Sequence, residues 1–487
     1  MEYFVSYFKA LKFARSSEKQ TSQDQQRLFN EAETIIHPAN QQLTSDTVES
    51  IEIKSHKRKR GGRKPFPKEI PREEVIHDLT DAEKICSCGE TREKIDELIT
   101  EKLDIVPAKI TIIKHICLKY SCKKCLAAKQ IKNAFKTAEN PAEILPKSNA
   151  SAGLFAHILT NKFCDHLPYY RQENIFARHG IDISRANMSA WQIQFYEQYD
   201  RLQKLFYEDI FKSPVLLADE TTLQVLQEKD RKDTQKSYMY ALAGKFNDRE
   251  MRVFSYRSTR SANFLSEYLE NFGGILHTDG FTSYDALCRD AKIPHAGCWA
   301  HTRRKFRDYN KHSPGGDDFS KHILKLIQQL YRYESTSCEQ KISLSDLREN
   351  RQKVSRAIVE NIFTLLEQKQ RSVVPESNLG KAIGYALNQR EKLKMFLEFP
   401  QLTLDTDAVE NAIRPFVLGR KNWLFSGSPR GADSSALVYS LIETAKANKI
   451  EPYFYLRHLF KKLPLCNSED EMRELLPHRI DPAAFKT

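Results

Sequence analysis

A short apolar run that leads directly into two acidic residues constrains this chain more than any other stretch. Val215–Ala218 is apolar, Asp219 and Glu220 follow at once, and an apolar/polar alternation resumes at Leu223. An apolar run of this length beside a proline predicts a buried strand. A carboxylate within a buried strand is costly unless it meets a cation or a metal ion, so Asp219 needs a partner.

Two further acidic residues are candidates for the same site. Asp279 follows a second apolar run, 274–278, at the end of a predicted strand, where open α/β sheets place their sites. Glu410 is predicted on a short helix. Three carboxylates suit a pair of Mg²⁺ ions, which prefer oxygen ligands and promote phosphodiester cleavage by activating the attacking hydroxyl and stabilising the leaving oxygen. The alternative for each residue is a solvated surface carboxylate, but the strand context of Asp219 and Asp279 favours a site.

The composition is that of a large globular protein with a basic balance. A chain of 487 residues predicts three or four units, and 76 Lys and Arg against 64 Asp and Glu favour a polyanionic partner. There is no run of about 18 apolar residues, which a membrane span would need. The N-terminus lacks the basic start and apolar core of a signal peptide. We therefore expect a cytoplasmic protein with no membrane partner.

Residues 1–75 are predicted to form a helical and basic N-terminal arm. Within it, 54–65 concentrates like charges between Gly and Pro, and such a segment cannot fold on itself. An extended arm of this kind can lie along DNA phosphates or enter a minor groove, and a flexible basic linker is the alternative. The candidate DNA-binding residues of the arm are Lys57, Arg58, Lys59, Arg60, Arg63 and Lys64.

Residues 76–130 hold two pairs of closely spaced cysteines, separated by a predicted hairpin at 105–120. The predicted ligands of a structural Zn²⁺ ion are Cys86, Cys88, Cys122 and Cys125. Four thiolates brought together by a hairpin suit tetrahedral zinc. His115 and Cys117 lie nearby as substitute ligands, and reduced free cysteines are the alternative.

Residues 140–208 have helical periodicity. A turn with an N-cap is predicted at 180–185, before a helix over 187–199. A helix, a tight turn and a second helix are compatible with a helix-turn-helix that binds DNA, and ordinary helical packing is the alternative.

Residues 209–306 are predicted to be strand-rich. The expected elements after Asp219 are paired strands at 237–243 and 252–256, a helix at 261–272, and a helix that starts at Cys298. Cys298 and His301 are three residues apart and share a helix face. The pair makes either a packing contact or a contact with the active centre.

Residues 307–400 are predicted to be an all-helical insertion, with apolar stripes at 323–333 and 356–368 that form its core. Residues 401–450 follow as a unit with Glu410, and 451–487 are a polar tail. Within 401–450, residues 419–427 interleave cations, an aromatic residue and glycines, which is typical of a loop that faces nucleic acid. The helix at 434–448 is expected to be amphipathic, with Leu437, Leu441 and Ile442 inside. Further candidate DNA-binding residues are Arg303, Arg304, Arg420, Lys421 and Trp423.

Several segments together resemble one protein family. They are Ala14–Lys19, Gly61–Pro65, the four cysteines, Cys164–Glu173, Ala177–Ser184, Ala218–Thr221, Thr278–Leu287, Gly297–Phe306 and Leu418–Gly427. In these segments the chain is similar to the transposases of the IS66 insertion-sequence family.

The resemblance implies the fold class and the chemistry of the chain. It implies an α/β fold, with an RNase H-like mixed-sheet core split by an all-helical insertion, and with N-terminal zinc-finger and helical DNA-binding regions. It places a DDE triad that uses Mg²⁺ or Mn²⁺ on Asp219, Asp279 and Glu410, and a Cys-x-x-His pair on Cys298 and His301. Such a transposase binds the terminal repeats of its element, frees a 3′-hydroxyl by hydrolysis and joins that end to target DNA. Its expected partners are DNA, further copies of the chain in the DNA complex, and small accessory proteins of the same element.

The chain departs from the family pattern at two places. The resemblance begins near residue 8, whereas the family starts with a longer leucine-zipper-like helix. Residues 405–411 have Asp-Thr-Asp and Glu-Asn where Asp-Asn-Asn and Glu-Arg are expected, although Glu410 itself is present. Two rival functions follow: a catalytically inactive or repurposed DNA-binding relative, and a nuclease that cleaves RNA with the same core.

Overall fold

The computed structural model describes residues 110–121, 135–138, 141–260, 269, 272–312, 317–340 and 342–485. The chain divides into two compact units, 35–140 and 1–34 with 141–487, and each is described by itself. In the smaller unit, β1 (Lys119–Ser121) pairs antiparallel with β2 (Phe135–Thr137). Residues 110–118 contain no strand. The prediction of a hairpin within 105–120 is therefore wrong for its described part, because 119–121 pair with a segment beyond Cys125.

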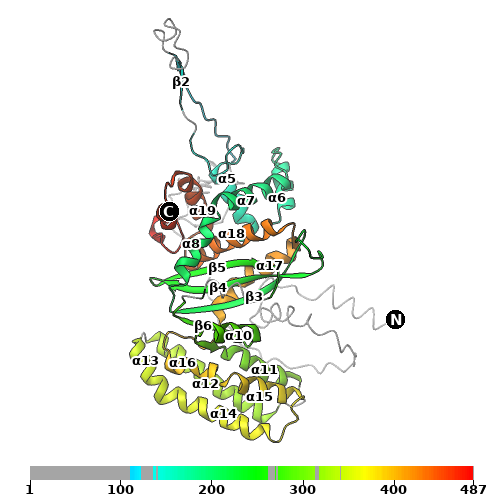
Figure 1. Cartoon of the computed structure of the whole chain (residues 1–487), viewed down its shortest axis with the longest axis vertical. Coiled ribbons are helices and arrows are strands. Elements are labelled where there is room, and N and C mark those ends of the chain that lie inside the picture. Colours follow the sequence, from blue (N-terminus) through cyan, green and yellow to red (C-terminus); the bar gives the residue numbers. More distant parts are fainter. Residues whose placement is uncertain are drawn as a thin grey trace, which may run out of the picture. The chain divides into compact units, whose positions relative to one another are not determined.

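The larger unit is built on a mixed six-stranded sheet (Figure 1). Its strands are β3 (Val215–Val225), β4 (Lys236–Phe246), β5 (Arg249–Arg257), β6 (Ile275–Thr278), β7 (His295–Gly297) and β8 (Phe425–Ser426). The order is β5-β4-β3-β6-β7, and β8 pairs with β3. β4 is antiparallel to β3 and β5, whereas β6 and β8 are parallel to β3, and β7 is parallel to β6. The strands predicted from residue 215 onward are confirmed, and the helix predicted at 261–272 lies mostly outside the described residues.

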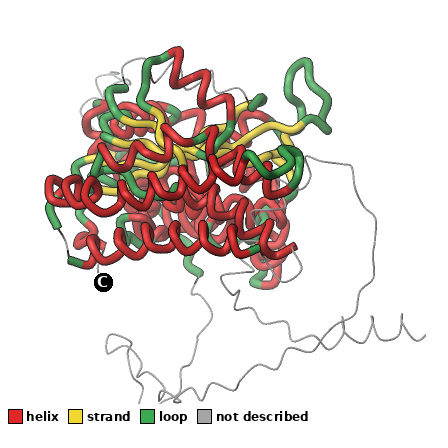
Figure 2. The backbone as a smooth tube through the Cα atoms, turned by 90° about the horizontal axis from the view of Figure 1, so that it is seen from below, coloured by secondary structure: helices red, strands yellow, loops and turns green. Residues whose placement is uncertain are grey.

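Helices that precede and follow the sheet along the chain surround it (Figure 2). Before the sheet come α5 (Ala152–Phe163), α6 (Tyr169–Arg178), α7 (Arg185–Tyr199) and α8 (Arg201–Ile210). Within and after it come α10 (Thr282–Asp290), α11 (Trp299–His312), α17 (Asp407–Trp423), α18 (Pro429–Ala447), α19 (Pro452–Lys462) and α20 (Glu469–Glu474). Of these helices, α8, α17 and α18 contact the sheet directly. Short 3₁₀ turns lie at Leu463–Leu465 and Pro482–Phe485. None of the helices in the described ranges is long and apolar enough to span a membrane.

The turn predicted before α7 is confirmed. Gly180 has a φ of 72°, a left-handed conformation that glycine adopts without strain, and the Ser184 side chain caps α7 by accepting a hydrogen bond from Asn187 N–H. α7 packs against α18 and buries Trp191 and Phe195 among its core residues. That face of the helix therefore belongs to the protein core, and the DNA-binding role of this region stays a prediction.

α18 is buried on almost all sides, so the prediction of an amphipathic helix is wrong. The helix runs along the edge strand β5 and beneath α7 and α19. Ser440, Thr444 and Asn448 are four residues apart, and their side chains accept hydrogen bonds from the N–H groups of Phe254 (2.8 Å), Arg252 (2.9 Å) and Glu250 (3.2 Å). Four helical residues rise about 6 Å and two strand residues about 6.8 Å, so the two spacings match closely. These polar groups complete the hydrogen bonding of a strand edge, which explains how a helix that carries them can be buried.

The insertion between β7 and α17 forms a helical bundle with its own hydrophobic core. Its helices are α12 (Asp318–Glu339), α13 (Leu344–Asn350), a π-helical turn (Arg351–Ser355), α14 (Arg356–Gln370), α15 (Asn378–Asn388) and α16 (Arg390–Glu398). Both predicted stripes are confirmed as core, with Ile327 and Phe363 fully buried. Trp299, at the start of α11, packs in the same core, so the insertion is joined firmly to the β7 edge of the sheet.

Candidate active site

Asp219 and Asp279 come from neighbouring parallel strands. β3 and β6 are in register with Leu217 opposite His277. The same offset, continued by two residues, sets Asp219 level with Asp279, which directly follows β6. The strand pairing therefore explains how two carboxylates 60 residues apart in sequence come together.

Glu410 reaches the same place from α17. It lies in the first turn of that helix, is 7% exposed, and α17 packs across β3. Burial is the first cause that raises the pKa of Asp219, and the neighbouring carboxylates of Glu220, Asp279 and Glu410 raise it further. The structure thus brings the three predicted carboxylates within electrostatic reach of one another.

The pKa values of the other two carboxyl groups are also raised, chiefly by burial. Around Asp279, a hydrogen bond from Phe281 N–H (3.0 Å) and the charges of Arg260 and Arg304 act in the opposite direction. The pKa of Glu410 is lowered in part by Arg304 but raised by acidic residues that start α17. A buried group of acidic oxygens with raised pKa values is the environment that a divalent cation relieves.

Glu220 projects to the opposite face of β3, since neighbouring strand residues alternate. Its carboxylate accepts hydrogen bonds from Arg260 Nε (2.7 Å) and from the Tyr284 hydroxyl (2.6 Å). Arg260 also lies over the Phe281 ring, 3.6 Å from its centroid. Arg260 therefore links Glu220 to the loop of Asp279, a role that the sequence analysis missed because no spacing or motif marks an arginine just after β5.

Cys298 and His301 lie beside Glu410. Cys298 is 2% exposed, and burial raises the pKa of its thiol to about 12. His301 Nδ1 is 3.8 Å from Glu410 Oε1. The buried Thr406 hydroxyl lies 3.5 Å from Cys298 Sγ and 3.4 Å from Glu410 Oε1. Of the two sequence interpretations, contact with the predicted active centre agrees with this geometry.

The two neighbouring arginines of α11 differ in their surroundings. Arg303 is exposed, whereas Arg304 is half-buried and its guanidinium lies 3.6 Å from Glu410 Oε2. Arg304 therefore lies within the carboxylate cluster, and Arg303 is at the surface.

The prediction of a loop over 419–427 is wrong for its first half, because Gly419–Trp423 form the last turn of α17. Arg420 is half-buried and donates hydrogen bonds to the hydroxyls of Thr221 (3.3 Å) and Thr222 (3.1 Å) on β3. Trp423 is half-buried and packs on the hydrophobic core, whereas Lys421 is exposed.

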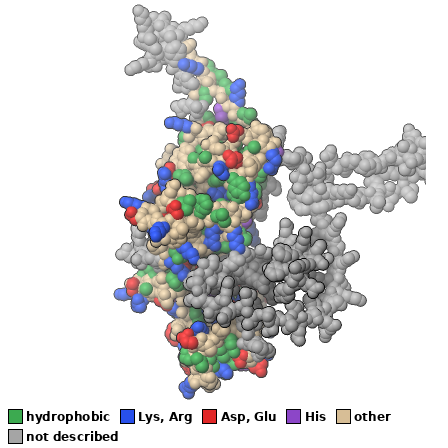
Figure 3. Space-filling model, turned by 90° about the vertical axis from the view of Figure 1, so that its right-hand side faces the viewer, with side chains coloured by type: hydrophobic (Ala, Val, Ile, Leu, Met, Phe, Trp, Pro, Cys, Tyr) green, Lys and Arg blue, Asp and Glu red, His purple; other side chains and the backbone are tan. Residues whose placement is uncertain are grey.

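The surface of the described residues carries Lys and Arg side chains scattered among apolar and acidic ones (Figure 3).

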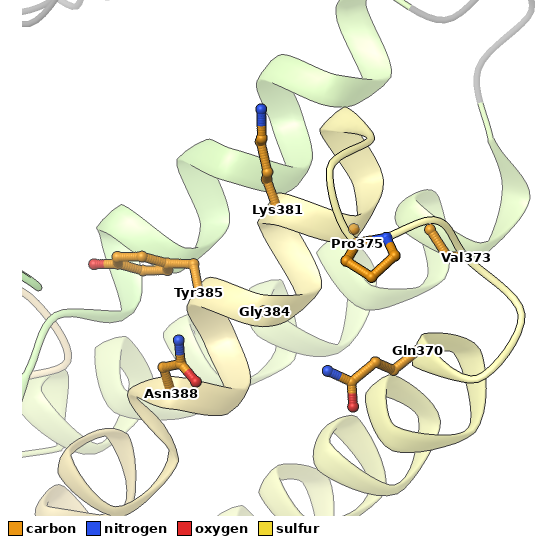
Figure 4. A pocket seen from close by; sticks show the side chains of 8 residues that line it. Gln370, Val373, Pro375, Lys381, Gly384, Tyr385 and Asn388 are labelled. Atoms are coloured by element: carbon orange, nitrogen blue, oxygen red, sulfur yellow. The ribbon is translucent and has the colours of Figure 1, made fainter.

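A cavity of about 270 Å³ opens on the insertion between α14 and α15. Lys381, Tyr385 and Asn388 of α15 and Gln370 at the end of α14 are among the residues that line it (Figure 4). A Cβ added at Gly280 would come within 2.6 Å of the Tyr385 ring, so this helix reaches the residue that follows Asp279.

The remaining predicted site residues lie outside the described residues. They are the arm residues Lys57, Arg58, Lys59, Arg60, Arg63 and Lys64 and the finger residues Cys86, Cys88, Cys122 and Cys125.

Four family models match the chain in succession. The largest, described as the transposase IS66 family, matches residues 147–434, and an IS66 C-terminal element matches 440–478. A zinc-finger binding domain of transposase IS66 matches 83–125. A model described as transposase C of IS166 homeodomain matches 2–75, so the similarity begins earlier than residue 8.

Curated relatives cover nearly the whole chain. The uncharacterized protein y4qI of Sinorhizobium fredii is 31% identical over 456 residues, which are 89% of this chain and 82% of the relative. The uncharacterized protein y4jD of the same organism is 30% identical over 85% of this chain and 81% of its own length.

Proposed function

The chain belongs to the IS66 transposase family, and we propose that it is a DDE-type DNA transposase whose catalytic residues are Asp219, Asp279 and Glu410. The observation that carries the proposal is the convergence of these three carboxylates, Glu410 buried and the other two half-buried, from β3, the end of β6 and the first turn of α17. Family membership supports DNA as the partner and zinc as the ion of the finger region.

The donor set supports a divalent cation of the Mg²⁺ or Mn²⁺ type. All three groups offer hard carboxylate oxygens, and burial together with the neighbouring charges, which include Asp279 and Glu410, raises the pKa of Asp219. When bound, such ions activate an attacking hydroxyl and stabilise the charge on the oxygen that leaves phosphorus. Asp219 and Asp279 would share the ions, and Glu410 would complete their coordination.

The other residues of the site would position these carboxylates. Arg260 pairs with Glu220 on the face of β3 that is turned away from α17. Asp219, on the other face, points toward α17. Arg304 holds Glu410 Oε2 from α11. In the first reaction the oxygen of water bonds to phosphorus and gives up a proton, and the 3′-oxygen leaves phosphorus and takes up a proton. In the second, the freed 3′-hydroxyl gives up its proton as its oxygen bonds to phosphorus of the target, and the displaced target 3′-oxygen takes up a proton.

The sheet supports an RNase H-like core. The antiparallel strands β5, β4 and β3 precede the parallel strands β6 and β7 in one sheet, and the helical bundle is inserted before α17. In this proposal the regions 209–306 and 401–450 form one catalytic core around the insertion at 307–400. The basic arm (1–75), the finger (76–130) and the helices of 140–208 recognise the element ends, and exposed cations such as Arg303 and Lys421 contact the DNA backbone.

The test is DNA cleavage by the Asp219→Asn variant. The substrate is a duplex that carries the terminal repeats flanking the gene, with Mg²⁺. We expect cleavage to fall by about three orders of magnitude, because several kcal/mol of charge stabilisation are lost, while DNA binding stays near the wild-type value. Asp290→Asn is the matched control, since Asp290 is an exposed carboxylate paired with Arg289 away from the cluster. Wild-type cleavage by Asp219→Asn would overturn the proposal.

A further inference from the structure

A second kind of metal site lies beside the predicted magnesium ligands. Within the described residues, Cys298, His301 and Glu410 form a group whose ligand atoms all lie within 4.8 Å of one another. Cys298 directly precedes α11, His301 follows one helical turn later, and Glu410 lies in the first turn of α17. A hydrogen bond from Trp299 N–H to Leu404 O (2.8 Å) ties the two segments together next to the group.

The distances suit an ion placed between these atoms. His301 Nδ1 and Glu410 Oε1 are 3.8 Å apart, which is too long for a hydrogen bond between them. Two ligands of one tetrahedral zinc ion are separated by roughly 3.3–3.8 Å, given bonds of about 2.0–2.3 Å. Only a small closing movement would therefore bring all three atoms to one ion.

The donor types select the ion. A thiolate and an imidazole are ligands of Zn²⁺ and related transition metals, whereas Mg²⁺ prefers oxygen ligands alone. The buried Thr406 hydroxyl lies within 3.5 Å of both Cys298 Sγ and Glu410 Oε1. From this position it can orient both ligands toward the ion. The Arg304 guanidinium lies 3.6 Å from the other oxygen of Glu410, Oε2, and Oε1 is the oxygen near His301 and Thr406.

We propose that Cys298, His301 and Glu410 bind one zinc-class transition-metal ion, distinct from the zinc of the finger region. Glu410 then presents Oε1 to this ion, and its Oε2, which lies 3.6 Å from Arg304, is the oxygen that would take part in the proposed magnesium site. This site has three protein ligands and an open fourth position, unlike the closed four-cysteine set predicted for the finger. The binding itself does not depend on the proposed transposase activity.

The experiment measures the metal content of the full chain without DNA. After saturation with Zn²⁺ and removal of excess ion by gel filtration, we expect Cys298→Ser to retain one zinc ion fewer per chain than the wild type. His301→Asn should lose the same ion. Cys288→Ser is the matched control, because Cys288 is also a buried free cysteine but lies outside the group, and it should retain the wild-type content.

Cobalt gives a second, spectroscopic measurement. The absorption spectrum of the Co²⁺-loaded wild type, minus that of Co²⁺-loaded Cys298→Ser, should show a thiolate-to-cobalt charge-transfer band. Cys288→Ser should keep this band. Far-ultraviolet circular dichroism checks that each variant is folded. Equal zinc content and no difference band in folded Cys298→Ser would overturn the proposal, and an undiminished content in Glu410→Gln would overturn the assignment of the third ligand. A protein that cleaves no DNA can still pass both measurements, so the two proposals fail independently.

Discussion

Magnesium should stabilise this chain against unfolding through the three carboxylates. The strongest charged influences on Asp219 are the neighbouring carboxylates of Glu220, Asp279 and Glu410, and all of them disfavour its ionised form. A ligand that binds only the folded state adds RT ln(1 + [L]/Kd) to the free energy of unfolding. At a magnesium concentration ten times the Kd, this is about 1.4 kcal/mol, or a rise of roughly 3 °C in Tm for a large cooperative unit.

Asp219→Asn tests the origin of this stabilisation. If the loss of one carboxylate weakens magnesium binding about tenfold, the same concentration adds only about 0.4 kcal/mol. Calorimetric or fluorescence melts of wild type, Asp219→Asn and the control Asp290→Asn, with and without Mg²⁺ at constant zinc, measure the difference. An equal magnesium shift in wild type and Asp219→Asn would refute the reasoning, because the ion would then bind elsewhere.

The pH dependence of the magnesium-free protein gives an independent check. The folded-state pKa values of Asp219, Asp279 and Glu410 are all raised, mainly by burial. The folded state therefore holds protons that the unfolded state releases. The contribution of these groups to the free energy of unfolding is thus most favourable below their unfolded-state pKa values. This contribution is lost as the pH rises through their folded-state pKa values. Asp219→Asn should flatten this decline, and magnesium should offset it at neutral pH.

Three further substitutions test the surroundings of the site. Thr444→Val should lower the free energy of unfolding by about 2–4 kcal/mol in chemical denaturation, because Thr444 is fully buried and both of its 2.9 Å hydrogen bonds to the β5 backbone are lost. Gly419→Ala should lower it by about 1–3 kcal/mol, because a Cβ there would overlap the Trp423 indole, and an unchanged denaturation midpoint would contradict this packing. Gly280→Ala should slow DNA cleavage about tenfold by displacing the loop of Asp279, and Tyr385→Ala in the same chain should restore part of the rate, since the ring lies 2.6 Å from the added Cβ.

Local patterns predicted four of the six strands of the sheet, β3 to β6, and the stripes of the insertion, because both depend on short-range periodicity. The apolar run before Asp219 became β3, and the stripe that contains Ile327 became the core face of α12. α18 shows where such reasoning fails. Its leucines suggested one buried face, but Ser440 and Thr444 are buried as well, because a strand edge 186–192 residues away supplies their hydrogen-bond partners. Only the tertiary structure creates those partners, so no local pattern in α18 reports them.

The same distinction applies to the candidate site. Asp219 and Asp279 could be singled out from sequence because each follows an apolar run, and their meeting then follows from parallel pairing of β3 with β6. Glu410 had no such strand context; it was a candidate from its place on a predicted helix, and the family resemblance then assigned it to the triad. Arg304 was predicted as a DNA-binding residue, and it lies beside Glu410, since the start of α11 and the start of α17 converge. That convergence adds a cysteine and a histidine to the carboxylate site, and it makes Glu410 the residue through which the two proposed metal sites would be linked.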